Sequence, residues 1–342
     1  MRMIRVLVVE DSLLFRELLV KNLNADPGIE VVATARDPFD ARDAIIKYKP
    51  DVMTLDIELP RMDGIEFLQK LMPQYPLPVV VISSLSDRVF DAMNAGAVDF
   101  VAKPANATRE QLQAFMKNDL AVKIKVASIA KVGNRKKAPL QMPSEHLGTE
   151  RKDLIVAIGA STGGTEAIST VIKDFDYDIP GVVIVQHMPP KFTEMYADRL
   201  NEKCRVHVKE AKTGDMVLPG QVLIAPGGDA HMRVVPKDNG YQVVIREGEK
   251  VNGHRPSVDV LFESVAQTAK NKAVGIILTG MGGDGAKGLL AMKNAGARTI
   301  GQDESTCVVY GMPKVAYDIG AVEYQEKLPD IAKRTYNVLS KM

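Results

Sequence analysis

Two series of short apolar runs, each run followed by an amphipathic stretch, constrain the fold of this chain more than any other feature. Strand-sized apolar runs that alternate with helix-length amphipathic stretches predict repeated βαβ units and a parallel sheet, so we expect an α/β protein. Ligands of such sheets bind at the carboxyl ends of the strands. The first series predicts five strands: Val6–Val9, Val31–Ala33, Val52–Leu55, Val79–Ile82 and Val98–Val101.

The alternation stops in the middle of the chain and then resumes. Residues 119–152 carry eight basic and three acidic side chains, and Pro139 and Pro143 interrupt them. Such a stretch is typical of a linker, although its start, Asp119–Ala130, could continue a helix. We therefore expect a first domain over residues 1–118, a basic linker over 119–150 and a second domain over 151–342.

Composition excludes several classes of protein. The formal net charge of the whole chain is +1, so no overall basic field favours nucleic acid as a partner. The two cysteines form no metal-binding or disulfide pattern, which fits a reducing compartment. No apolar run approaches the ~20 residues of a membrane span, and Met1 leads directly into a strand rather than a signal peptide. We expect a cytoplasmic protein that does not insert into the membrane.

Acidic and polar residues stand where the strands of the first series end. Glu10 and Asp11 follow the first apolar run and Asp56 follows the third, while Ser83 and Lys103 follow the fourth and fifth. Three converging carboxylates suit a hard cation such as Mg²⁺, and the lysine could pair with an anion held there. Any one of these acids could instead be a helix N-cap, but five positions in strand order are harder to explain that way.

The second series places three chemically suited residues after predicted strands. Leu154–Ile158 leads into a Gly159–Gly164 turn whose spacing matches a nucleophile elbow and projects Ser161. His187 directly follows the strand Gly181–Gln186 and could act as the base, and Asp284, in a glycine loop after Val274–Leu278, could orient it. If these strands are neighbours in a parallel sheet, all three side chains meet at one edge. Residues 204–247 predict an antiparallel hairpin in addition.

Each of these features has a less specific interpretation. Glycine-rich turns between a strand and a helix commonly bind cofactor phosphates, so the second domain could bind a nucleotide. His187 could be a buried, satisfied histidine, and Asp284 could be a helix N-cap. A domain that binds a partner or regulates transcription is a further alternative, although no basic recognition helix is visible.

The first domain resembles the receiver domain of two-component response regulators. The resemblance implies a flavodoxin-like fold with a five-stranded parallel sheet. It also implies that Asp56 is the phospho-acceptor, that Glu10, Asp11 and Asp56 bind Mg²⁺, and that three residues switch the domain on phosphorylation: Ser83, Phe100 and Lys103.

Three motifs of the second domain resemble chemotaxis protein-glutamate methylesterases of the CheB family. They are Gly159–Gly164, Gln186–Met188 and Gly280–Gly285. The resemblance implies a doubly wound α/β esterase domain with a mainly parallel sheet and no cofactor. It implies that Ser161 attacks the methyl ester of a receptor glutamate, that His187 moves the proton and that Asp284 orients His187. Backbone N–H groups near Thr162 and Met281 are the candidates for the oxyanion hole.

The same resemblance implies partners and a role. Methyl-accepting chemotaxis receptors would be the substrate, a chemotaxis histidine kinase would be the phosphodonor, and the activity would serve adaptation in chemotaxis. Selected receptor glutamines would be deamidated at the same site. Since a receiver is fused to a hydrolase, we hypothesise that the unphosphorylated receiver blocks the Ser161 edge and that phosphorylation of Asp56 releases it.

Overall fold

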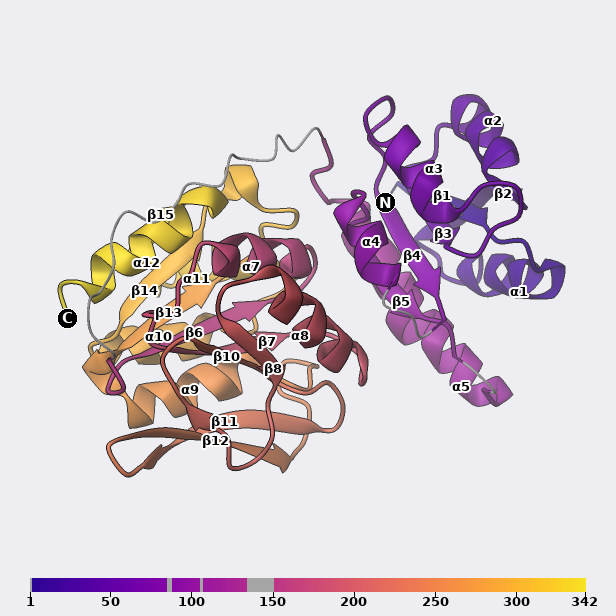
Figure 1. Ribbon diagram of the computed structural model, residues 1–342. Coiled ribbons are helices and arrows are strands. Elements are labelled where there is room, and N and C mark those ends of the chain that lie inside the picture. Colours follow the sequence, from indigo (N-terminus) through magenta and orange to yellow (C-terminus); the bar gives the residue numbers. More distant parts are fainter. Residues whose placement is uncertain (1, 85–87, 105–106, 134–150) are drawn as a thin grey trace. The chain divides into compact units, whose positions relative to one another are not determined.

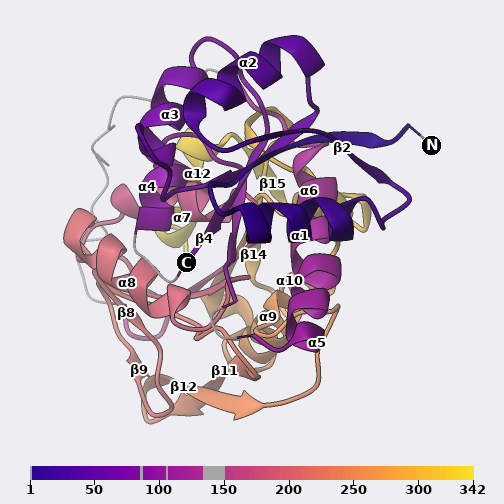
Figure 2. The same cartoon turned by 90° about the vertical axis from the view of Figure 1, so that its right-hand side faces the viewer.

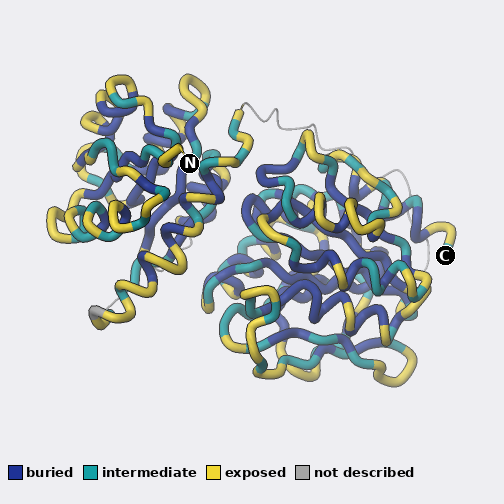
Figure 3. The backbone as a smooth tube through the Cα atoms, turned by 180° about the vertical axis from the view of Figure 1, so that it is seen from behind, coloured by how far each residue is buried: buried dark blue, intermediate teal, exposed yellow. Residues whose placement is uncertain are grey.

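The computed structural model describes residues 2–84, 88–104, 107–133 and 151–342 of the chain. Two compact units divide the chain, Met1–Lys136 and Lys137–Met342. Most of the expected linker, residues 134–150, lies outside the described residues. In both units the strands form the buried interior and the exposed residues gather on helices and loops (Figure 3).

The first unit is built on the expected five-stranded sheet. Its strands run in the order β2-β1-β3-β4-β5, and every neighbouring pair is parallel. This is the flavodoxin-like order, in which the chain reverses direction beside β1 and leaves a crevice at the carboxyl ends of β1 and β3. The strands are β1 (Ile4–Val9), β2 (Ile29–Ala35), β3 (Val52–Asp56), β4 (Val79–Ser83) and β5 (Asp99–Ala102).

Helices cover both faces of this sheet (Figure 2). Side-chain caps begin four of them: the Ser12 hydroxyl accepts from Phe15 N, Asp37 and Asp63 accept from the first turns of the second and third helices, and the Thr108 hydroxyl accepts from Gln111 N. The helices are α1 (Leu13–Leu23), α2 (Pro38–Tyr48), α3 (Gly64–Leu71), α4 (Arg88–Asn94) and α5 (Arg109–Ala114).

The last helical segment extends the first unit beyond the boundary that the sequence predicted. A π-helix, Phe115–Leu120, continues into α6 (Ala121–Ala127) without a break. Leu120 and Ile124 are fully buried on this segment, and α6 packs against β3, β4 and β5. Residues 119–127 therefore belong to the first unit, because their apolar face closes one side of its sheet.

The second unit contains a seven-stranded sheet in the order β15-β14-β13-β6-β7-β10-β8, with every neighbouring pair parallel. A separate antiparallel sheet, β11-β12-β9, holds the expected hairpin. The strands are β6 (Ile155–Ala160), β7 (Gly181–Gln186), β8 (His207–Glu210), β9 (Met216–Val217), β10 (Gln221–Ile224), β11 (Ala230–Lys237), β12 (Gly240–Glu247), β13 (Ala273–Ile277), β14 (Arg298–Gln302) and β15 (Tyr324–Glu326).

Helices lie on both faces of the seven-stranded sheet, as the doubly wound fold requires (Figure 1). On one face α9 and α10 pack together, and α9 also covers β11. Within the described residues, no helix is both long and apolar enough to cross a membrane. The helices are α7 (Gly164–Lys173), α8 (Phe192–Lys203), α9 (Val258–Thr268), α10 (Ala286–Asn294), α11 (Met312–Asp318) and α12 (Ile331–Leu339).

The packing of α6 predicts that Ile124→Ala destabilises the first unit by about 2–5 kcal/mol, because it opens a cavity against the sheet. Val122 is 50% exposed on the same helix, so Val122→Ala should change stability by less than about 0.5 kcal/mol. Native-state hydrogen exchange of the β4 and β5 amides in the full chain measures both effects. Equal protection in the two variants would show that α6 is not part of this core.

Candidate active site

The three strands that lead to Ser161, His187 and Asp284 are neighbours in the sheet. β6 lies between β7 and β13, with Gly159 opposite both Val185 and Ile277. Since all three strands are parallel, the loops that follow them leave from the same edge. The adjacency on which the sequence interpretation depended is therefore present.

The turn between β6 and α7 holds Ser161 at this edge. Ser161 N donates to Thr279 O at 3.0 Å, and Ser161 O accepts from Gly164 N at 2.7 Å. Gly163 precedes α7 with φ +77°, in the left-handed region, and a Cβ at Gly164 would lie 2.1 Å from Gln186 Oε1. Residues 162–165 are buried, whereas Ser161 is partly exposed. The turn thus leaves the serine accessible at the start of a helix.

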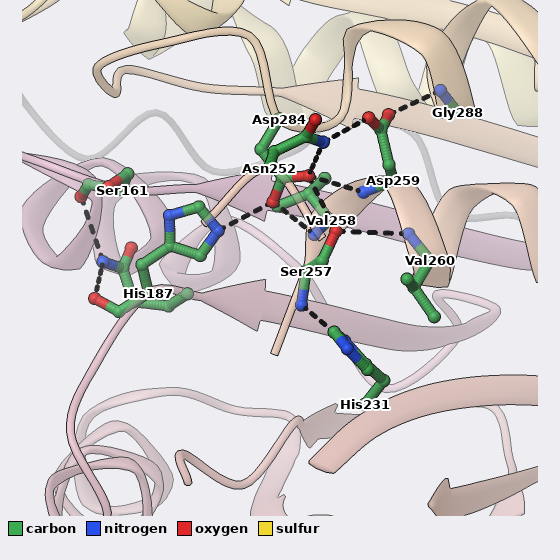
Figure 4. Close-up of polar contacts among 11 residues, drawn as sticks. Ser161, His187, His231, Asn252, Ser257, Val258, Asp259, Val260, Asp284 and Gly288 are labelled. Carbon is green, nitrogen blue, oxygen red and sulfur yellow. Dashed lines mark hydrogen bonds and ion pairs between the residues drawn. The ribbon is translucent and has the colours of Figure 1, made fainter. Parts of the chain in front are cut away.

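His187 lies between Asp284 and Ser161 (Figure 4). Its Nε2 is 2.9 Å from Asp284 Oδ2, and Figure 4 shows the other ring nitrogen, Nδ1, on the side of Ser161. Nδ1 is buried and has no hydrogen-bond partner among the described residues. A ring whose Nε2–H donates to the carboxylate leaves Nδ1 as a proton acceptor beside the serine. The ring also stacks on His254, with centroids 3.8 Å apart.

Asp284 is held as a buried anion. Its side chain is 1% exposed and accepts hydrogen bonds from His187 Nε2, Asn252 Nδ2 and Ser257 Oγ. The backbone N–H groups of Val258 and Asp259 donate to it as well. Burial alone would raise the pKa of this carboxyl group, but the bond to His187 and the other donors outweigh burial and hold the pKa well below its usual range. Asp284 is therefore ionised in the folded protein at neutral pH.

The two candidates for the oxyanion hole lie next to Ser161 in the chain or next to a residue that packs on it. Thr162 follows it in the chain, is buried, and accepts at its backbone oxygen from Thr279 Oγ1 at 3.0 Å. Met281 follows Gly280, which packs so closely on the serine that an added Cβ would lie 2.8 Å from Ser161 Cβ. Their backbone N–H groups remain the predicted donors to a developing oxyanion.

Several glycines of these motifs are required by packing rather than by a ligand. A Cβ at Gly159 would lie 2.2 Å from Val258 Cγ1, and one at Gly285 would lie 2.5 Å from the same atom. A Cβ at Gly280 would also lie 2.2 Å from Met312 Sδ. Side chains of the protein occupy the space that a phosphate would need near these glycines, which disfavours the interpretation that these turns bind a nucleotide.

Sequence reasoning missed four residues that border the site. Gln186 Nε2 donates to the backbone oxygens of Ser161 and His187, at 3.0 and 3.2 Å. Ser257 and Asn252 bind Asp284, and His254 stacks on His187. Gln186 is a polar residue at the end of a buried strand and belongs to one of the three motifs, so the sequence could have identified it as part of the site. Asn252 lies in a loop outside the three motifs, and no local pattern marks it.

The expected acidic site of the first unit is also assembled. Glu10 and Asp56 are buried and Asp11 is exposed, and one carboxylate oxygen from each lies within 4.8 Å of the others. Lys103 Nζ is 2.6 Å from Asp56 Oδ2 and 2.9 Å from Glu10 Oε2. Burial raises the pKa of Glu10 to about 6, and the Asp56 charge adds to the rise, whereas Lys103 opposes it. The three carboxylates together carry more negative charge than the ammonium group of Lys103 balances.

Ser83 and Phe100 occupy neighbouring strands beside this site. Ser83 ends β4 and is buried, and its backbone oxygen accepts from Lys103 N at 2.6 Å. Phe100 is buried on β5, edge-on to Phe90 at 6.2 Å, with Lys123 Nζ 5.3 Å from the Phe100 ring. The part of these two residues in switching remains a prediction.

Comparison with known proteins decides the family. Residues 156–335 match the CheB methylesterase family, and residues 6–116 match the response regulator receiver domain. The chain belongs to the CheB methylesterase family. The expected ester hydrolase fused to a receiver domain is thereby confirmed, as is the expected α/β fold of each half.

Two curated relatives and one solved structure illustrate the similarity of this CheB chain. A protein of Syntrophomonas wolfei named "Protein-glutamate methylesterase/protein-glutamine glutaminase 2" is 60% identical, over 100% of this chain and 99% of its own. A Salmonella typhimurium protein named "Protein-glutamate methylesterase/protein-glutamine glutaminase" is 48% identical, over 100% of this chain and 98% of its own. The CheB methylesterase catalytic domain of Thermotoga maritima is 38% identical with a TM-score of 0.53, covering 54% of this chain and 98% of that domain.

The contact between Gly280 and Ser161 predicts that Gly280→Ala lowers the rate at which a fluorophosphonate modifies Ser161. The added methyl group must displace Met312 or the serine turn, and a misplacement of ~1 Å costs about 100-fold. Gly240→Ala is the control, because its Cβ would meet nothing closer than 3.4 Å. Intact-mass measurements give both rates, and equal rates would contradict the packing argument.

Proposed function

We propose that this chain is a phosphorylation-regulated protein-glutamate methylesterase that also deamidates selected glutamines. The names of the curated relatives supply both activities, and the bond between His187 Nε2 and Asp284 Oδ2, beside Ser161, is the observation that carries the proposal. The substrates we propose are methyl-accepting chemotaxis receptors, and the role is adaptation in chemotaxis.

In the proposed reaction Ser161 Oγ attacks the carbonyl carbon of the glutamate methyl ester. His187 Nδ1 accepts the serine proton, and Asp284 stabilises the resulting imidazolium through Nε2–H. Backbone N–H groups at Thr162 and Met281 would bind the oxyanion of the tetrahedral intermediate, which is worth about 3–4 kcal/mol per aligned donor.

The intermediate then collapses and breaks the bond to the methoxy oxygen. His187 returns the proton to that oxygen, so methanol leaves and the glutamyl group stays on Ser161. Water attacks this acyl-enzyme and gives a proton to His187. His187 then passes that proton to Ser161 Oγ as the bond between the acyl group and the serine breaks, which releases the free glutamate and restores the serine. With a glutamine side chain the same steps release ammonia in place of methanol.

We propose that Asp56 is the phospho-acceptor and that a chemotaxis histidine kinase is the phosphodonor. Glu10, Asp11 and Asp56 offer clustered carboxylate oxygens, the ligands that Mg²⁺ prefers, and Lys103 pairs with only two of them, Glu10 and Asp56. A bound Mg²⁺ would neutralise charge between the carboxylates and an incoming phosphoryl group. Lys103, already within 2.6 Å of Asp56, is placed to pair with the phosphorylated side chain, while Ser83 and Phe100 would carry the change to the surface.

The decisive measurement is methanol release from methylated receptor, with and without a small-molecule phosphodonor. We expect Ser161→Ala to lose about 10⁴-fold or more in rate, because no nucleophile remains. Asp56→Ala should keep the basal rate and lose the stimulation by the phosphodonor. A Ser161→Ala protein that still releases methanol would refute the assignment, and full stimulation of Asp56→Ala would refute that of the phospho-acceptor.

The metal proposal predicts that Glu10→Gln weakens Mg²⁺ binding at least about tenfold, since it removes one charged ligand from the cluster. Asp40→Asn is the matched control, because Asp40 lies on α2 in an exposed pair with Arg36. Calorimetric titration with Mg²⁺ compares the two variants with the wild type. An unchanged affinity in Glu10→Gln would remove Glu10 from the proposed ligands.

A further inference from the structure

Two helices, α9 and α10, begin next to Asp284. The first turn of each helix donates hydrogen bonds to a carboxylate that lies at the start of the other helix. Asp284, just before α10, accepts from Val258 N and Asp259 N in the first turn of α9, at 2.7 and 3.2 Å. Asp259, in that turn of α9, accepts from Gly288 N in the first turn of α10, at 2.6 Å. Helix N-termini stabilise anions, so this crossed arrangement supports two buried carboxylates close together.

Asn252 joins these two carboxylates. Its Nδ2 is 2.7 Å from Asp259 Oδ2 and 2.8 Å from Asp284 Oδ1. An amide NH₂ group has two donors, so one side chain can satisfy both anions (Figure 4). The loop carries Asn252 at φ +52°, in the left-handed region that asparagine tolerates better than most residues. Asn252 is itself exposed and thus stands between the carboxylate pair and water.

We propose that Asn252 is a positioning residue of the esterase reaction, which together with Asp259 fixes the Asp284 carboxylate in its bond to His187. This inference rests on the proposed function. Asn252 and Ser257 hold Oδ1 of Asp284, and this arrangement turns Oδ2 toward His187. Without the amide, Oδ1 loses a donor and the charge of Asp259 is no longer separated from that of Asp284.

Among the described residues, the titratable groups that contact Asp284 or its donors include His187, Asp259 and His231, whose Nδ1 accepts from Ser257 N at 3.1 Å. Asp284 faces His187 directly and Asp259 through Asn252, and His187 faces Asp284 and stacks on His254. Burial raises the pKa of Asp259, and the charge of Asp284 adds to the rise, while bonds from Gly288 and Asn252 oppose it. Replacing the bridging amide by an acid therefore adds negative charge next to both carboxylates and favours the imidazolium form of His187.

The test compares two variants of the full chain, Asn252→Asp and Asn252→Gly, with the wild type. Aspartate keeps the shape and turns the donor into a charge, and glycine removes the side chain while it tolerates the positive φ. We expect kcat for methanol release to fall about 10- to 100-fold in both variants, with KM within about twofold, because Asn252 binds Asp259 and Asp284 and acts on the reaction through Asp284. In Asn252→Asp the acid limb of the kcat/KM profile should also move to higher pH.

Asn201→Asp provides the control for the substitution itself. Asn201 is exposed on α8 and uses its Oδ1 as an acceptor from Val208 N, which aspartate preserves, so rate and pH profile should stay unchanged. If Asn252 only supports the fold, its variants will lower the melting temperature but leave kcat and the acid limb as in the wild type, and the inference is then wrong. A wild type that releases no methanol would refute the proposed function instead.

Discussion

The buried carboxylate of Asp284 is the group on which the hydrolase half of the molecule depends. An ionised carboxylate removed from water must be surrounded by donors, and this one receives five hydrogen bonds. The donors come from the end of β7, the loop before α9, the residue that caps α9 and the first turn of α9. The interaction that orients the candidate base therefore also determines where α9 begins and how its loop crosses the sheet edge, so folding of this unit assembles the site.

Close main-chain packing complements that electrostatic requirement. Val258, the first residue of α9, lies against both Gly159 and Gly285, so it touches the ends of the serine turn and of the Asp284 loop at once. Gln186 fills the space beside Gly164 and binds the backbone oxygens of Ser161 and His187. Glycine is needed at these positions because a neighbouring segment occupies the space that a Cβ atom would fill. The same packing explains why a glycine-rich turn here need not bind a phosphate.

The strands were predictable because β6, β7 and β13 are buried on both faces and so appear as continuous apolar runs. The meeting of Ser161, His187 and Asp284 followed from the parallel order of those strands. Asn252 was not predictable, because its contacts are set by a loop conformation that leaves no periodic pattern. The sequence predicted an end of the first unit that is too early. The lysines of α6 alternate with apolar residues, so the face formed by Leu120 and Ile124 was not recognised as part of the core. The N-cap interpretation of Asp284 is wrong for the helix that follows it, because Gly285 precedes α10 without a side-chain cap and the Asp284 carboxylate binds the first turn of α9 and His187 instead.

Both halves place acids at the carboxyl edge of a parallel sheet, and the difference in their partners gives them different chemistry. In the receiver, three carboxylates lie close together and Lys103 pairs with two of them, Glu10 and Asp56, so a divalent cation would balance the remaining negative charge. Around Asp284 the donors are one imidazole, one amide, one hydroxyl and two backbone N–H groups, so both oxygens are satisfied by the protein. Since four of these five donors cannot carry charge at neutral pH, the negative charge of Asp284 stays available to the imidazolium that His187 would become in the proposed reaction. The proposed metal-dependent switch and the proposed hydrolytic site would thus share one strand-end geometry and differ in the charge of the groups that face the acids.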